Sequence, residues 1–83
     1  MTFSQRFSYT NSTGVDVRLI LEPWGEQYVI HSGQQVDITV SSNTSDGCVE
    51  FEQIPGGFIV YGYESSVVSL SSDGRELVPD TQV

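Results

Sequence analysis

The segment VDVRLILEPWGEQYVIHSGQQVDITV, residues 15–40, decides the fold because hydrophobic and polar residues alternate on both sides of a bend. A period of two residues is typical of a β-strand with one buried face. The hydrophobic residues that share a face are Val15, Val17, Leu19 and Leu21 before the bend and Val36, Ile38 and Val40 at the end of the segment. Pro23 and Gly25 form the bend, since Pro lacks a ladder donor and Gly accepts unusual backbone angles. We expect Trp24, between them, to cap one end of the core.

The rest of the chain continues the alternating pattern. It does so in the stretches FSQRFSY, CVEFEQI, FIVYGYE, VVSLS and RELVP, with turn residues between them. Such spacing of short strands is typical of sandwiches and barrels, and no window has the period of a helix. One sheet cannot bury all these hydrophobic faces, whereas two packed sheets can. We therefore predict an all-β fold over residues 1–83: a single small antiparallel two-sheet Greek-key sandwich, immunoglobulin-like or cupredoxin-like in layout and without metal. A small β-barrel is the alternative.

Two glycine turns predict the register of two hairpins. Asp73-Gly74 and Gly56-Gly57 both suit a two-residue type I′ turn, in which both central residues have positive φ. The pairs predicted across these hairpins are Leu70 with Leu77, Ser72 with Arg75, Ile54 with Ile59, Glu52 with Tyr61, and Glu50 with Tyr63. The residues predicted to share the core face of the second hairpin are Val49, Phe51, Phe58 and Val60. Two carboxylates and two tyrosines are then left together on its outer face.

The charge of the chain restricts its partners. Eleven acidic residues face three basic ones, which gives a formal net charge of -8. Such a surface repels phosphate backbones and anionic lipid, so we expect no nucleic-acid binding and no membrane binding. The N-terminal stretch has no hydrophobic run, from which we expect a cytoplasmic protein without a signal peptide. The Asn-x-Ser/Thr triplets at residues 11–13 and 43–45 are then interpreted as polar turns.

The residues that could carry chemistry are few. Cys48 is the only cysteine and His31 the only histidine, so an intramolecular disulfide, a blue-copper site and a Cys-rich zinc site are all excluded. Serines are plentiful, but only one histidine can activate them, and no nucleophile-elbow motif is present. Carboxylate pairs such as Glu50 and Glu52 are common on any solvated strand. We therefore predict no catalytic residue, no metal ligand, no cofactor and no enzymatic activity.

Three functional hypotheses remain. The first is a protein-interaction or structural module that binds a protein partner, or a second copy of itself, through a sheet face. Aromatic residues with a few charges favour interfaces, and the residues chosen for this face are Trp24, Glu50, Glu52, Tyr61 and Tyr63. The second hypothesis is a small-ligand-binding protein or enzyme that uses Glu22, Glu26 and His31 at the Trp24 corner. The third is an acidic inhibitor or immunity-type protein that blocks a basic partner.

The run Leu21-Glu22-Pro23-Trp24-Gly25-Glu26, followed by an aromatic residue, a glycine turn and an alternating strand, resembles a pattern found in small bacterial proteins. The resemblance covers residues 17–40, under a third of the chain. It implies a bacterial cytoplasmic β-sandwich. No activity is attached to that pattern, so it assigns no catalytic or binding residue.

Overall fold

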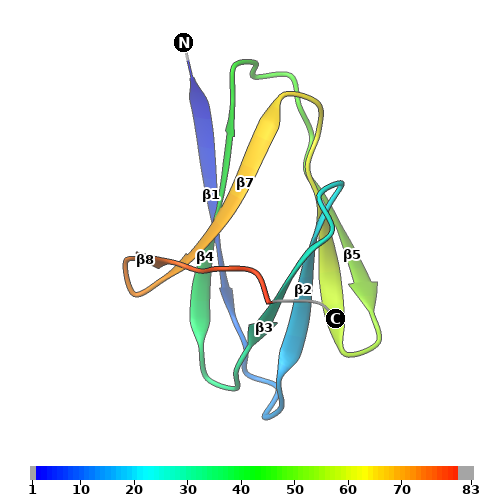
Figure 1. Cartoon of the computed structure of the whole chain (residues 1–83), viewed down its shortest axis with the longest axis vertical. Coiled ribbons are helices and arrows are strands. Elements are labelled where there is room, and N and C mark those ends of the chain that lie inside the picture. Colours follow the sequence, from blue (N-terminus) through cyan, green and yellow to red (C-terminus); the bar gives the residue numbers. More distant parts are fainter. Residues whose placement is uncertain (1, 81–83) are drawn as a thin grey trace.

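The computed structural model describes residues 2–80 and places them in two facing β-sheets (Figure 1). The predicted two-sheet sandwich is confirmed, and the sheets do not close into a barrel. The residues described contain no helix, and so none that could cross a membrane. The strands are β1 (Phe3–Thr10), β2 (Val17–Glu22), β3 (Glu26–Ile30), β4 (Gln35–Ser42), β5 (Glu50–Ile54), β6 (Gly57–Tyr61), β7 (Ser66–Ser72) and β8 (Arg75–Glu76).

The chain passes repeatedly from one sheet to the other. The first sheet has the strand order β1-β4-β7-β8 and the second has the order β3-β2-β6-β5. Neighbouring strands are antiparallel, with the exception of β2 and β6, which run parallel. The edge strands are therefore β1 and β8 in the first sheet, and β3 and β5 in the second.

The core lies between the sheets and is made by the alternating residues that the sequence predicts. Its buried hydrophobic residues are Leu19, Leu21, Tyr28, Ile30, Val36, Ile38, Val40, Val60, Val68 and Leu70. Val15, which the alternation assigns to the same face as Leu19, instead lies before β2 and is 65% exposed. The alternation is therefore correct within the strand but extends one step too far toward its start.

The two hairpins differ in how well their register was predicted. Asp73 and Gly74 both have positive φ, and Ser72 lies opposite Arg75 as expected. The register predicted for β5 and β6 was wrong by two residues. Their turn is Pro55-Gly56, so Glu50 lies opposite Tyr61. A shift of two residues leaves each side chain on its predicted face, because side chains alternate with a period of two.

The bend between β2 and β3 holds Trp24 at the surface. The main-chain N–H of Gly25 donates to the carbonyl oxygen of Leu21 at 2.8 Å, and Gly25 has a φ of 74°. Trp24 is 43% exposed and does not join the core cluster, contrary to the expectation that it caps the core. Its ring lies over Gly62, where an added Cβ would come within 2.6 Å of the ring atom Cη2.

Candidate functional site

The two lateral sides of the sandwich differ in whether the chain connects the two sheets there. On one side, the chain leaves β8 and crosses toward β3. Leu77 packs against the core on this path, and the Asp80 N–H donates to the carbonyl oxygen of Gln27 in β3 at 2.7 Å. On the opposite side, β1 and β5 are the last strands of their sheets, and no backbone hydrogen bond within residues 2–80 joins them. The side between β1 and β5 is called the open edge below.

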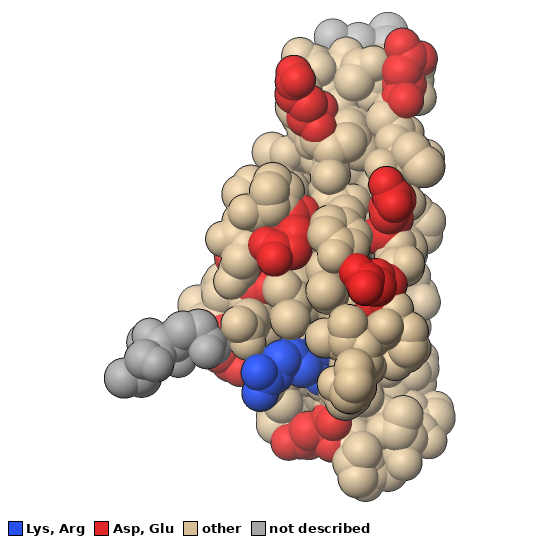
Figure 2. All heavy atoms as spheres, turned by 90° about the vertical axis from the view of Figure 1, so that its right-hand side faces the viewer, with Lys and Arg blue, Asp and Glu red and all other residues tan. Residues whose placement is uncertain are grey.

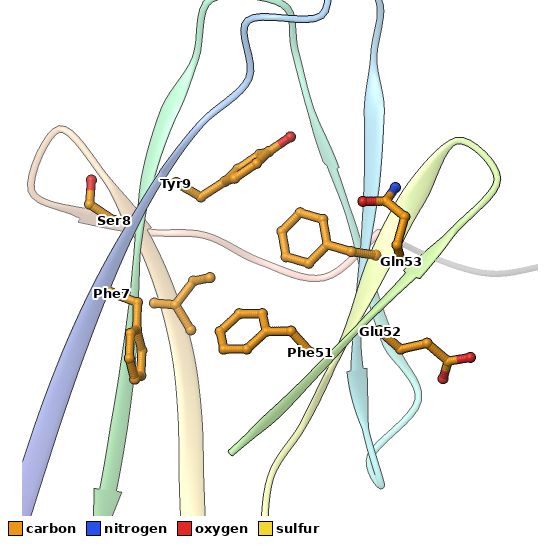
Figure 3. A pocket seen from close by; sticks show the side chains of 8 residues that line it. Phe7, Ser8, Tyr9, Phe51, Glu52 and Gln53 are labelled. Carbon is orange, nitrogen blue, oxygen red and sulfur yellow. The ribbon is translucent and has the colours of Figure 1, made fainter. Parts of the chain in front are cut away.

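An aromatic groove lies between the sheets at the open edge. Its volume is about 500 Å³, and its lining residues are Phe7, Ser8, Tyr9, Ile38, Phe51, Glu52, Gln53 and Phe58. Tyr9 and Phe51 point toward each other's sheet across this space, whereas Glu52 points away from it (Figure 3). The groove therefore has a hydrophobic floor that belongs to the inner faces of both sheets.

Strand register explains why these rings face inward. Phe7 lies opposite Ile38, whose side chain is buried in the core, so Phe7 points to the same face. Phe51 lies opposite the buried Val60 in the same way. Nevertheless Phe7 is 36% exposed and Phe51 is 51% exposed. Both are core-facing residues that remain in contact with solvent because each belongs to a strand at the open edge, where no backbone hydrogen bond within residues 2–80 joins the two sheets.

The rings contact one another across the groove. The centroids of Phe7 and Phe51 lie 5.8 Å apart with their planes at 79°, an edge-to-face arrangement. The ring centroids of Tyr9 and Phe58 lie 4.8 Å apart. At the rim, the Gln53 side chain donates to the carbonyl oxygen of Gly57 at 2.8 Å. These contacts hold the groove walls in place and leave the exposed part of Phe51 available to a ligand.

The outer face of the second sheet carries an acidic cluster, made by Glu22, Glu50, Glu52 and Tyr61. Tyr61 lies beside Glu22 of β2 and Glu50 of β5, and its hydroxyl donates to Glu52 at 2.6 Å. That hydrogen bond, followed by burial and the three negative charges, raises the pKa of Tyr61. Figure 2 shows separate patches of acidic side chains from the top to the bottom of this side of the molecule, and basic atoms only toward its lower end.

The structure brings together only part of the binding face expected from the sequence. Glu50, Glu52 and Tyr61 do meet on the outer face, and Glu22 joins them. Tyr63 does not, because it follows the end of β6 and packs over Gly47, against the core. Trp24 stands at the bend beyond β2, above Gly62.

The second expected grouping is spread over β3. Glu26 lies at the start of the strand and accepts a 3.3 Å hydrogen bond from the Tyr28 hydroxyl. His31 follows the other end of the strand, roughly 16 Å away at about 3.3 Å per residue, and its Nδ1 contacts Asp16 at 3.1 Å. Glu22 belongs to the acidic cluster on the outer face. These three residues therefore line no common pocket among those described.

The aromatic groove is the feature that sequence reasoning missed. Phe51 and Phe58 were assigned to the core face correctly, but an inward residue of an edge strand is buried only where another part of the chain covers that edge. Tyr28 and Ile30 of the edge strand β3 are buried, whereas Phe51 of β5 is not. No local signal distinguishes an edge strand from a central one in this chain. Among residues 2–80, no three His, Cys, Asp or Glu side chains are placed to hold a metal ion.

No protein-family model, curated protein or solved structure matches this chain.

Proposed function

We propose that this protein is an interaction module that binds an extended segment of a protein partner at its open edge. The observation that carries the proposal is the aromatic groove, in which Phe51 and Phe7 face the core yet remain exposed. Complete burial of one Phe side chain contributes about 1.5–3 kcal/mol. A ligand that covers the exposed half of Phe51 therefore gains on the order of 1 kcal/mol from that ring alone.

The backbone at the open edge also favours an extended ligand. An edge strand presents unpaired N–H and C=O groups, which a further strand can satisfy. Binding by strand addition combines these main-chain hydrogen bonds with pockets for alternate side chains. The groove supplies such a pocket directly beside β5.

A displayed library of random peptides tests this function. The protein and a Phe51→Ser variant are each used to select binders, with Val67→Ser as the matched control. Val67 is 65% exposed on β7, away from the groove. Peptides that bind the unmodified protein and Val67→Ser, but not Phe51→Ser, support the proposal. Failure to enrich any peptide, or equal binding to all three proteins, contradicts it.

A second candidate function, an acidic inhibitor of a basic partner, is favoured by the acidic cluster around Tyr61. Here charge alone would recognise the partner, so a lysine-only peptide should bind, and the Phe51→Ser change should leave its affinity unaltered. If that peptide does not bind at low salt, where electrostatic attraction is strongest, the inhibitor hypothesis fails.

A further inference from the structure

The two edges that flank the groove differ in the chemistry that they offer. We infer that the partner segment pairs with β5, through the main chain of Phe51 and Gln53, and that it alternates hydrophobic with basic residues. This inference rests on the proposed function and specifies its ligand. It follows from three properties of β5: the direction of its main-chain groups, the side chains on its two faces, and its exposure.

The hydrogen-bond pattern identifies the free groups of β5. The two-residue turn Pro55-Gly56 closes on Ile54 and Gly57, and the closing pair of such a hairpin exchanges main-chain hydrogen bonds. In an antiparallel ladder the bonded pairs alternate. Glu50, Glu52 and Ile54 therefore direct their main-chain groups to β6, and Phe51 and Gln53 direct theirs to the open edge.

The bonds on the far side of β6 agree with this parity. The Arg18 N–H donates to the Gly56 carbonyl oxygen at 2.9 Å, and the Gly62 N–H donates to the Glu22 carbonyl oxygen at 2.8 Å. The even-numbered residues from Gly56 to Gly62 thus direct their main-chain groups to β2. The main-chain groups of the odd-numbered Gly57, Ile59 and Tyr61 point to β5. The residues of β5 from Glu50 to Gln53 are exposed, so a new strand can reach the main-chain groups that point to the open edge.

The side chains of β5 then determine the sequence of the ligand. On the inner face, an added strand meets Phe51 and, across the groove, Phe7, which favours hydrophobic residues. On the outer face it lies beside Glu50 and Glu52, which favour Lys or Arg. Because successive side chains of a strand alternate between faces, the two preferences alternate along the ligand.

The edge of β1 offers the opposite charge. The Asn11 N–H donates to the Gln34 carbonyl oxygen, so the odd-numbered residues of β1 direct their main-chain groups to β4. The main-chain groups of Ser4, Arg6 and Ser8 therefore point to the open edge. The outward side chains of β1 include Arg6 and no acid. A basic segment therefore has no carboxylate to meet on β1. A protein with a net charge of -8 also repels the acidic segment that Arg6 would favour.

A second copy of this chain fits β5 poorly. Antiparallel pairing of two β5 strands through Phe51 and Gln53 sets Glu52 opposite Glu52, and the register that pairs Phe51 with Phe51 sets Glu50 opposite Glu52. Like charges directly opposite each other are destabilising. The charge of each copy adds a long-range repulsion. The occupant is therefore a basic partner segment.

Three synthetic peptides test the inference. The alternating basic peptide is Val-Lys-Val-Lys-Val-Lys-Val; a block peptide has the same composition with the four Val first; an alternating acidic peptide has Glu in place of Lys. We expect the alternating basic peptide to bind at least about tenfold more tightly than either of the others. Amide hydrogen exchange measured by NMR should slow at Phe51 and Gln53 on binding.

Variants locate the charges. Glu50→Gln combined with Glu52→Gln should weaken the alternating basic peptide several-fold, whereas Asp37→Asn, which removes an acid from β4, should leave its affinity unchanged. Protection at Ser4, Arg6 and Ser8 instead of Phe51 and Gln53 overturns the assignment to β5. Equal binding of the acidic or block peptide, or no binding of the basic one, overturns the ligand chemistry. In each of these cases the proposed function still stands if library peptides bind in a Phe51-dependent way, and it fails if they do not.

Discussion

Asn11 and Asn43 each begin an Asn-x-Ser/Thr triplet, and both were interpreted as polar turns, yet their surroundings differ. Asn11 is fully buried, and its Nδ2 donates to the carbonyl oxygens of Val15 and Ile30, each at 2.8 Å. Its Oδ1 accepts from the N–H and the hydroxyl of Thr13. Asn43 is exposed in the connection between β4 and β5. One side chain therefore joins β1 to the end of β3, a role that no local pattern in the sequence indicates.

Replacing Asn11 by Ala should lower the free energy of unfolding by about 3 kcal/mol, because the buried carbonyl oxygen of Ile30 loses its donor. Asn43→Ala should change it by less than about 0.5 kcal/mol. Urea unfolding of the two variants measures the difference. Equal effects would mean that the Asn11 hydrogen bonds contribute nothing to stability.

Tyr28 makes the stability sensitive to alkaline pH. Burial, and then the adjacent Glu26 carboxylate, raises the pKa of Tyr28 from 10.0 to about 12. Between these values the folded protein keeps a proton that the unfolded chain has released, so the free energy of unfolding falls as the pH rises. The raised pKa of Tyr61 acts in the same direction, and the chain contains no lysine to add its own titration.

We expect a loss on the order of 2 kcal/mol across that pH range, measurable by chemical unfolding at a series of pH values. Glu26→Gln should reduce the loss by removing the charge, and the remainder should persist because burial is the larger cause. Glu64→Gln, an exposed acid on the connection before β7, serves as the control. A stability that stays constant across the range would contradict the pKa shift of Tyr28.

At the scale of elements, alternation and turn residues predicted the strands well, but not the pairing of β5 with β6. Both Pro55-Gly56 and Gly56-Gly57 have residues that suit a two-residue turn, and the strand registers that they produce differ by two residues. Because a two-residue shift keeps every side chain on its face, the hydrophobic pattern cannot distinguish them. The structure selects Pro55-Gly56, with Pro in the first central position and Gly56 at a φ of 77°.

This register gives the two glycines different roles, and so different costs of substitution. A Cβ on Gly57 would overlap the carbonyl oxygen of Arg18 in the parallel neighbour β2, whereas a Cβ on Gly56 would meet no atom within 4 Å. Gly56→Ala should cost about 1–2 kcal/mol from its positive φ, and Gly57→Ala about 3 kcal/mol or more from the clash. Thermal unfolding tests the order. If Gly57→Ala were the milder change, the β2–β6 pairing described here would be wrong.

For the whole molecule, the sequence predicted two facing sheets but not which strands would lie at their edges. Strand order depends on contacts between residues distant in the chain, such as β2 with β6 and β1 with β4. The groove exists because the chain covers one side, through Leu77 and Asp80, and leaves the side with Phe7 and Phe51 uncovered. Glu50, Glu52 and Tyr61 could be grouped from the sequence, because they belong to a single hairpin whose faces survive a two-residue shift. Tyr63 could not be placed, since it lies beyond the end of β6.

The excess of acidic residues should make folding and binding respond to salt in opposite directions. Screening the repulsion among acids, including Glu22, Glu50 and Glu52, stabilises the folded chain. The same screening weakens attraction to a basic peptide, since the Debye length shortens to about 10 Å at 0.1 M salt. We therefore expect added salt to raise the melting temperature and to lower the affinity for the alternating Val-Lys peptide. Neutralising Glu50 and Glu52 with Gln should reduce both responses. A peptide affinity that does not depend on salt would show that the groove alone, without the acidic face of β5, holds the ligand.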